Sequence, residues 1–230
     1  MIKYYPTVLL SGLGDPSHIK ELRALAESVG GSLLTVVPPG TRHVLGADGI
    51  DLTAYIDWES CIEACRRSAV HGGRVFVREP QIRYERLANV IRSLELRVVA
   101  LDTDVSYDDD PSWIVERIEL AQQRVAIEYY IVDLFTGVEA SWDFFIHETR
   151  PEEFGPEDLR DLCARFPILL TADVSDANVL DIASFPGARG LLLTCDELRP
   201  TYPADRHAVS FEAIRGLLRR LWNGRTVEPG

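Results

Sequence analysis

The sequence predicts an α/β fold in which eight parallel β-strands alternate with helices and close into a single (β/α)8 barrel. Strand-like apolar runs alternate with helix-like periodic segments from end to end. Such alternation indicates a parallel sheet, because parallel neighbours need a crossover helix between them. The chain has 230 residues, close to the roughly 250 of one such barrel. Eight units over this length favour a closed barrel over an open sheet.

The first half of the chain supplies four strand-like runs rich in aliphatic and β-branched residues. Helical periodicity follows the first and third runs, and glycines end the second of these helices. The second unit is the weak one, because 40–49 is too short and glycine-rich for a full crossover helix. The expected strands are 7–10, 32–37, 50–56 and 74–78, and the expected helices are 18–29 and 58–70.

The second half repeats the pattern with clearer helix starts. Carboxylates and Pro111 precede one helix, and Pro156 opens another at its first turn. The expected strands are 96–101, 127–134, 168–171 and 190–194, and the expected helices are 82–94, 113–123, 156–164, 176–183 and 210–222. No linker or low-complexity run divides the chain. We therefore expect one barrel domain over 1–222 and a polar C-terminal tail over 223–230.

The net charge of -12 disfavours nucleic acid and anionic membranes as partners, since both attract basic surfaces. The four cysteines match no zinc or redox spacing and are expected to be buried apolar residues; a metal pair of Cys61 and Cys65 with His71 is the remote alternative. The N-terminus shows no secretory signal pattern, and no apolar run reaches the ~18 residues that span a bilayer. We expect a cytoplasmic protein.

A barrel builds its site from the C-terminal ends of its strands. The residues at those positions form an unusually acidic set. Each carboxylate alone could simply cap a helix or face water, but together they would repel one another, raise one another's pKa or attract a cation. The set consists of Ser11, Arg42, Asp57, Arg78, Glu79, Asp102, Asp104, Asp133, Asp143, Asp173, Asp196 and Glu197. The chain contains no dinucleotide fingerprint, P-loop, zinc-protease motif or nucleophile elbow.

Five segments, in the right order, resemble those of phosphoribosylanthranilate isomerase, a TIM-barrel enzyme of tryptophan biosynthesis. Residues 9–13 read Leu-Leu-Ser-Gly-Leu where the family has Lys-Ile-Cys-Gly-Leu, and 39–44 read Pro-Gly-Thr-Arg-His-Val against Ser-Pro-Arg-Tyr-Val. Residues 137–144 read Gly-Val-Glu-Ala-Ser-Trp-Asp-Phe where the family has a glycine-rich run ending Phe-Asp-Trp. Residues 170–179 read Leu-Thr-Ala-Asp-Val-Ser-Asp-Ala-Asn-Val against Leu-Ala-Gly-Gly-Leu-x-x-x-Asn-Val, and 193–197 read Leu-Thr-Cys-Asp-Glu against Ser-Ser-Gly-Val-Glu.

The resemblance implies an Amadori rearrangement by a cysteine general base and an aspartate general acid. Asp143 stands at the acid position, where apolar neighbours such as Trp142 could keep its carboxyl protonated. Ser11 replaces the cysteine, and a serine hydroxyl needs a partner base, for which Asp15 or a residue at a neighbouring strand end is a candidate. Arg42 matches the residue that holds the anthranilate carboxylate; its alternative role is a surface salt bridge.

The phosphate-binding glycines of the family are replaced here by Ala172 and Asp173, and Asp196 is added after the eighth strand. Glycines let backbone N–H groups approach a phosphate at a helix N-terminus, whereas a carboxylate repels it. We therefore expect the standard phosphate site to be lost. The predicted substrate-binding residues are Arg42, Asp133, Asp173, Thr194 and Asp196.

Four hypotheses follow. The preferred one is a divergent enzyme that acts by acid–base chemistry on a small molecule, which could carry a carboxylate. The second is a working phosphoribosylanthranilate isomerase. The third is a barrel with a divalent metal on Asp102, Asp133, Asp173 and Asp196, although no cofactor is expected under the first two. The fourth is a non-catalytic binding barrel. The oligomeric state is not predicted; Trp113 and Trp222 could lie in the core or at an interface, and the core is favoured.

Overall fold

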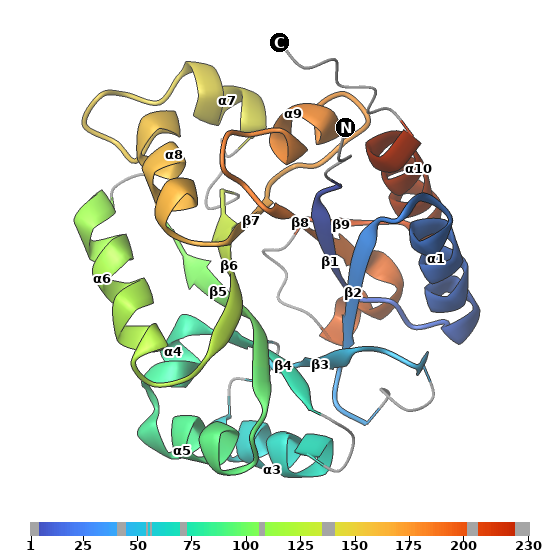
Figure 1. Cartoon of the computed structure of the whole chain (residues 1–230), viewed down its shortest axis with the longest axis vertical. Helices are drawn as coiled ribbons and strands as arrows, with labels where there is room; N and C mark the ends of the chain where they lie inside the picture. The colour runs from blue at the N-terminus through green and yellow to red at the C-terminus, as the bar shows by residue number, and fades with distance from the viewer. Residues whose placement is uncertain are drawn as a thin grey trace.

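The computed structural model describes residues 5–40, 45–53, 55, 57–69, 73–105, 109–134, 141–201 and 207–223. Eight parallel strands form a closed barrel with helices outside it (Figure 1), which confirms the predicted fold class. The strands are β1 (Thr7–Ser11), β2 (Ser32–Val37), β3 (Gly49–Asp51), β4 (Arg74–Arg78), β5 (Arg97–Asp104), β6 (Ile127–Asp133), β7 (Ile168–Thr171) and β8 (Gly190–Cys195).

The barrel closes between its first and last strands. β1 pairs in parallel with β8 from Thr7 opposite Gly190 to Ser11 opposite Thr194, so the N-terminal strand has neighbours on both sides. A short ninth strand, β9 (Ala208–Val209), which the sequence pattern did not predict, pairs with the end of β8. Closure removes the open edges that would otherwise expose unpaired backbone groups.

The helices begin and end where their capping residues predict. α1 begins after Asp15, whose carboxylate accepts from Ser17 N–H, and ends at Gly30, which has a φ of 73°. Asp110 caps α6 in the same way. The helices are α1 (Pro16–Val29), α3 (Trp58–Ala69), α4 (Glu79–Arg83), α5 (Glu85–Ser93), α6 (Pro111–Gln122), α7 (Trp142–His147), α8 (Pro156–Arg165), α9 (Val179–Ala183), the 3-10 helix η1 (Asp196–Thr201) and α10 (Phe211–Asn223).

Two apolar cores hold the barrel together. Inside it, one side chain from each of several strands forms a small cluster that includes Leu9, Phe76, Ile131, Leu169 and Leu192. A larger cluster fills the space between the barrel and its helices. Alternate residues of a strand point to opposite sides, which explains why the strands carry apolar residues on both faces.

Two predicted elements differ from the structure for local reasons. The third strand ends at Asp51 rather than at residue 56, because the Asp51 carboxylate accepts from Thr53 N–H at 2.9 Å and from its hydroxyl at 2.5 Å. The predicted helix 82–94 is two helices separated at Tyr84, whose ψ of 102° is extended. In the described part of the chain, no helix is long and apolar enough to cross a membrane.

Candidate functional site

The strand register places a polar ring at the C-terminal end of the barrel interior. Leu9, Phe76, Ile131, Leu169 and Leu192 point inward, so the residues two positions later in the same strands point inward as well. Asp51 and Asp102 join them, because they pair with Phe76 and Arg78. We call this set the mouth ring: Ser11, Asp51, Arg78, Asp102, Asp133, Thr171 and Thr194.

Arg78 and Asp102 form the charged side of the mouth ring. The Arg78 Nε atom lies 3.7 Å from Asp102 Oδ2 across the β4–β5 pair. The Asp102 side chain is 8% exposed, whereas that of Arg78 is 36% exposed. The guanidinium is therefore partly open to solvent, while the carboxylate of Asp102 is largely shielded from it. Asp133 ends β6 nearby and is half-buried.

Ser11 and Thr194 form the neutral side of the mouth ring. Both are buried, and their hydroxyl oxygens lie 3.1 Å apart. The base considered for Ser11 is engaged elsewhere: Asp15 Oδ1 accepts from the N–H and the hydroxyl of Ser17 at 2.7 Å each. These hydrogen bonds also lower the pKa of Asp15. The Ser11 hydroxyl can therefore orient a ligand through hydrogen bonds, with Thr194 as its neighbour.

Asp143 lies on the first turn of α7, and its side chain is 90% exposed. The Nε2 atom of His147 lies 3.7 Å from Asp143 Oδ1. The apolar enclosure that we expected around this carboxyl is not formed. Trp142 turns inward instead and is buried against Phe145 and Phe185. The role of Asp143 as general acid stays a prediction.

Two other predicted binding residues, Arg42 and Asp196, are not part of the mouth ring as defined above. Arg42 lies outside the described residues, so its role as a carboxylate clamp stays a prediction. Asp196 begins η1 and is exposed. Of the further strand-end candidates, Asp57 caps α3 through the N–H groups of Glu59 and Ser60. Glu79 is 4% exposed and pairs outside the barrel with Arg83 and Arg117.

Asp173, in the loop after β7, caps a helix. Its Oδ1 accepts from Trp142 N–H at 2.7 Å, at the N-terminus of α7. Asn178 fixes the same loop, because its side-chain amide donates to Asp173 O at 3.0 Å and its Oδ1 accepts from Ser175 N–H at 2.7 Å. A side-chain carboxylate thus takes up a backbone N–H group in the region where the resemblance would place a phosphate.

Glu197 does the same after β8. Its Oε2 accepts from Gly14 N–H at 2.7 Å and from Asp15 N–H at 3.0 Å, and its Oε1 lies 2.5 Å from His18 Nδ1. The His18 ring stacks on Phe211 with centroids 3.6 Å apart. Glu197 therefore connects the β8 loop to the start of α1.

Gly12 lets the two loops approach each other. Its φ is +80°, and a Cβ atom there would lie 2.1 Å from Cys195 O. Only glycine avoids both this contact and the strain of a left-handed backbone. Glu197 is one of the predicted strand-end candidates, whereas His18, which is 179 residues away in the chain, was not predicted.

The cysteines are buried and do not supply a thiolate at neutral pH. Burial raises the pKa of Cys61 and Cys195 to about 11, and that of Cys65 and Cys163 to about 12. Within the described ranges, no group of three or more His, Cys, Asp or Glu side chains is arranged to hold a metal ion. His71, which would join Cys61 and Cys65 in the alternative metal site, lies outside those ranges.

No protein-family model matches the chain, and no curated protein matches its sequence. Solved structures with the same fold include phospho-2-dehydro-3-deoxyheptonate aldolase (DAHP synthase) of Thermotoga maritima, at a TM-score of 0.57 and 11% identity over 95% of this chain and 68% of that one. They also include N-(5'-phosphoribosyl)anthranilate isomerase of Pyrococcus furiosus, at 0.56 and 11% over 95% of this chain and all of that one.

A third structure is Rubisco of Pyrococcus horikoshii, at a TM-score of 0.51 and 10% identity over 96% of this chain and 59% of that one. These three barrels are enzymes of different kinds, and their TM-scores to this chain are similar. The likeness therefore establishes the TIM-barrel fold and leaves the activity to be inferred from the site.

Proposed function

We propose that this protein is a small-molecule enzyme that acts by acid–base chemistry at the barrel mouth on a ligand with a carboxylate group. The observation that carries the proposal is the Arg78–Asp102 pair, which faces inward at the C-terminal ends of β4 and β5 with Nε and Oδ2 3.7 Å apart. Barrel enzymes place their chemistry at this end.

Each residue has a role that follows from its position. Arg78 binds the ligand's carboxylate, since a guanidinium offers paired donors that match two carboxylate oxygens. Asp102, beside it and largely buried, gives or takes a proton. Asp133, Thr171 and the Ser11–Thr194 pair orient the ligand through hydrogen bonds. In this proposal, Arg42 remains a second clamp and Asp143, on the first turn of α7, a second acid.

The proposed function does not include binding of a phosphate group by the loops after β7 and β8. The loops after β7 and β8 already direct two carboxylates at backbone N–H groups, Asp173 at Trp142 and Glu197 at Gly14 and Asp15. A phosphate dianion would have to displace these carboxylates and would be repelled by them.

The test compares ligand-induced thermal stabilisation in three proteins: wild type, Arg78→Gln and the control Arg97→Gln. Arg97 is exposed at the opposite end of β5, so its replacement removes the same charge far from the mouth. Malonate, anthranilate and inorganic phosphate serve as ligands. We expect at least one carboxylate to raise the melting temperature of wild type and Arg97→Gln but not of Arg78→Gln. Equal stabilisation of all three proteins, or of none, would contradict the proposal.

A second candidate function is phosphoribosylanthranilate isomerase itself, favoured by the structural match over the whole of the Pyrococcus furiosus enzyme. Complementation of a bacterium that lacks this isomerase separates the two candidates. Growth without tryptophan would establish the second candidate. Absence of growth by a protein that is expressed and folded supports the first.

A further inference from the structure

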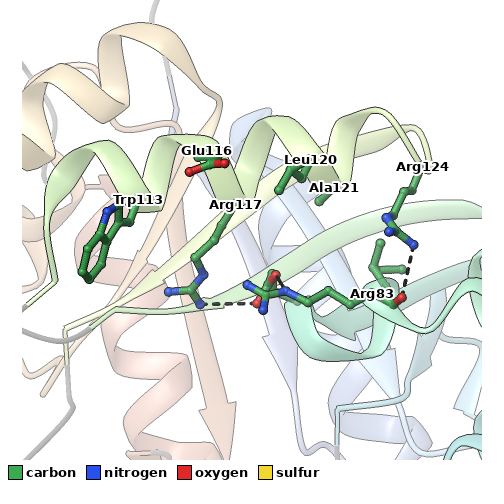
Figure 2. Close-up of a pocket in the computed structure, with 9 residues that line it drawn as sticks. Arg83, Trp113, Glu116, Arg117, Leu120, Ala121 and Arg124 are labelled. Atoms are coloured by element: carbon green, nitrogen blue, oxygen red, sulfur yellow. Dashed lines mark hydrogen bonds and ion pairs between the residues drawn. The ribbon is translucent and has the colours of Figure 1, made fainter.

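Helix α4, which follows β4 directly, is fixed to α6 outside the barrel. Glu79, its first residue, is 4% exposed; its Oε2 lies 3.4 Å from Arg117 Nη2, and it also pairs with Arg83. Figure 2 shows the two arginines in a groove of about 500 Å³ between the helices. Trp113 also lines this groove and is 61% exposed, so the expectation that it lies in the core is wrong, whereas Trp222, at 2% exposure, does lie there.

The same helix directs one buried amide, that of Gln81, at the ends of β3 and β4. Gln81 is 1% exposed. Its Oε1 accepts from Arg78 N–H at 2.7 Å, and its Nε2 donates to Leu52 O at 2.8 Å and to Tyr55 O at 3.2 Å. An amide has one acceptor end and one donor end, so these partners determine its orientation. Gln81 therefore connects the backbone after β3 to the last residue of β4.

This connection stands where the β3–β4 hydrogen-bond ladder would otherwise continue. Just beyond β3, Leu52 N–H still donates to Phe76 O at 2.8 Å. In a regular parallel ladder, Leu52 O would next accept from the N–H two residues further along β4, which is that of Arg78. Both groups bond to Gln81 instead. The amide thus replaces one rung of the ladder, and its length spaces the two strand ends further apart than a direct hydrogen bond would.

We propose that Gln81 is a positioning residue for Arg78: its amide holds the end of β4 away from β3 and so keeps the Arg78 guanidinium beside Asp102 of β5. This inference rests on the proposed function, in which Arg78 binds the carboxylate of the ligand. Nε of Arg78 and Oδ2 of Asp102 are 3.7 Å apart across the β4–β5 pair. Without the amide, Arg78 N–H and Leu52 O each need a new partner and can pair with one another, which draws the end of β4 toward β3.

A purely structural amide and a positioning amide have different consequences. A structural amide only satisfies buried backbone groups, so its loss lowers stability and leaves the mouth of the folded protein unchanged. A positioning amide also determines where the guanidinium lies, and a displacement of about 1 Å can weaken a site strongly. The test must therefore measure the position of Arg78 and the binding of a ligand in variants that remain folded.

Ligand-free crystal structures of Gln81→Met and of a matched control give the first readout. Methionine is of similar size but lacks the amide's donors. We expect the Arg78 guanidinium to move by about 1 Å or more relative to Asp102. The control is Asn178→Leu, which removes another bridging amide in the loop after β7, three strands away around the barrel. It should leave the separation of Arg78 Nε and Asp102 Oδ2 at 3.7 Å.

Calorimetric titration with malonate gives the second readout. Gln81→Met should bind malonate about tenfold or more weakly than wild type although Arg78 is intact, whereas Asn178→Leu should bind like wild type. Gln81→Glu adds a pH test. A protonated carboxyl can accept and donate as the amide does, but a carboxylate only accepts. Its affinity relative to wild type at the same pH should therefore be close to one at pH ~5 and should fall by pH ~8.

The role of Gln81 and the proposed function fail in different ways. If wild type and Arg78→Gln bind malonate equally, or neither binds it, the proposed function is wrong, and the crystal structures alone decide whether Gln81 positions Arg78. If Arg78→Gln loses malonate while Gln81→Met binds it like wild type and keeps Arg78 in place, the positioning role is overturned. Circular dichroism and melting temperatures confirm that every variant is folded.

Discussion

Carboxylates line both sides of the barrel's C-terminal end, but they are used differently on each side. On the β4–β5 side, Asp102 faces the interior next to a partly exposed guanidinium. On the β7–β8–β1 side, Asp173 and Glu197 accept hydrogen bonds from backbone N–H groups and connect loops. In the first arrangement a charged group at the mouth is partly open to solvent, whereas in the second the carboxylates accept hydrogen bonds within the protein. Whether a carboxylate at a strand end belongs to the site can therefore be judged only once its hydrogen-bond and ion-pair partners are known.

The largest effect that this comparison predicts is on the β8–β1 side. Gly12→Ala introduces a Cβ atom 2.1 Å from Cys195 O on a backbone with a φ of +80°. We expect a loss of about 3 kcal/mol or more in the free energy of unfolding, measured by urea denaturation. Gly30→Ala is the matched control. Its φ is +73° with no atom within 4 Å of the added Cβ, so it should cost only about 1 kcal/mol. Equal losses would show that the loops do not approach closely.

The next effect distinguishes the two sides directly. Glu197→Ala leaves the N–H groups of Gly14 and Asp15 without their acceptor and should destabilise the fold by about 2 kcal/mol. Asp102→Asn should change stability by less than about 1 kcal/mol, because asparagine keeps the size of the side chain and one acceptor oxygen, and the ion pair that it weakens is long and partly exposed, with Nε and Oδ2 3.7 Å apart. The same substitution should abolish activity on the natural substrate. A reversed order of stability losses would refute the assignment of the two sides.

A third prediction concerns pH, and here the two sides should behave alike. Burial holds the pKa of Cys61, on α3, and of Cys195, at the end of β8, at about 11. The unfolded chain loses these protons near pH ~8.5. Between that pH and about 11, the folded state therefore retains protons that the unfolded chain has lost. Stability is therefore complete below about pH 8.5 and falls as pH rises toward 11, by about 1–2 kcal/mol per thiol at pH ~10.

Urea denaturation of wild type, Cys61→Ala and Cys195→Ala at pH ~8 and ~10 measures this effect. Each variant should lose less stability than wild type between the two pH values, whatever its absolute stability. An unchanged pH dependence in Cys195→Ala would mean that this thiol ionises readily and could act as a base.

The smallest effect is expected at the cap of α7. Asp173→Ala removes the acceptor of Trp142 N–H and should cost about 1 kcal/mol. Asp176→Ala removes the same charge from an exposed position of the same loop and should cost less than about 0.5 kcal/mol. If both variants were equally stable, Asp173 would be available to a ligand, and the β7 loop would have to be reconsidered as part of the site.

The fold could be predicted because strand and helix periods are local properties of the chain. Members of the mouth ring were anticipated only where strand ends were placed correctly. Asp102, Arg78 and Ser11 were found because β1, β4 and β5 end near their expected positions. Asp51 was missed, and Asp57 was chosen in its place, because the carboxylate of Asp51 ends β3 early through Thr53.

Contacts between distant parts of the chain could not be predicted. His18 and Glu197 meet only because β1 and β8 are neighbours in the closed barrel, and neither residue's local sequence shows it. The exposure of Asp143 likewise depends on how α7 packs. Its first residue, Trp142, is turned inward, and its backbone N–H bonds to a loop 31 residues later.

The most direct test of the account is a crystal structure of the protein soaked in malonate and phosphate together. The account predicts malonate density within hydrogen-bonding distance of the Arg78 guanidinium, and the carboxylates of Asp173 and Glu197 still bonded to the N–H groups of Trp142, Gly14 and Asp15. Phosphate bound at those N–H groups, with the two carboxylates displaced and no anion at Arg78, would contradict it.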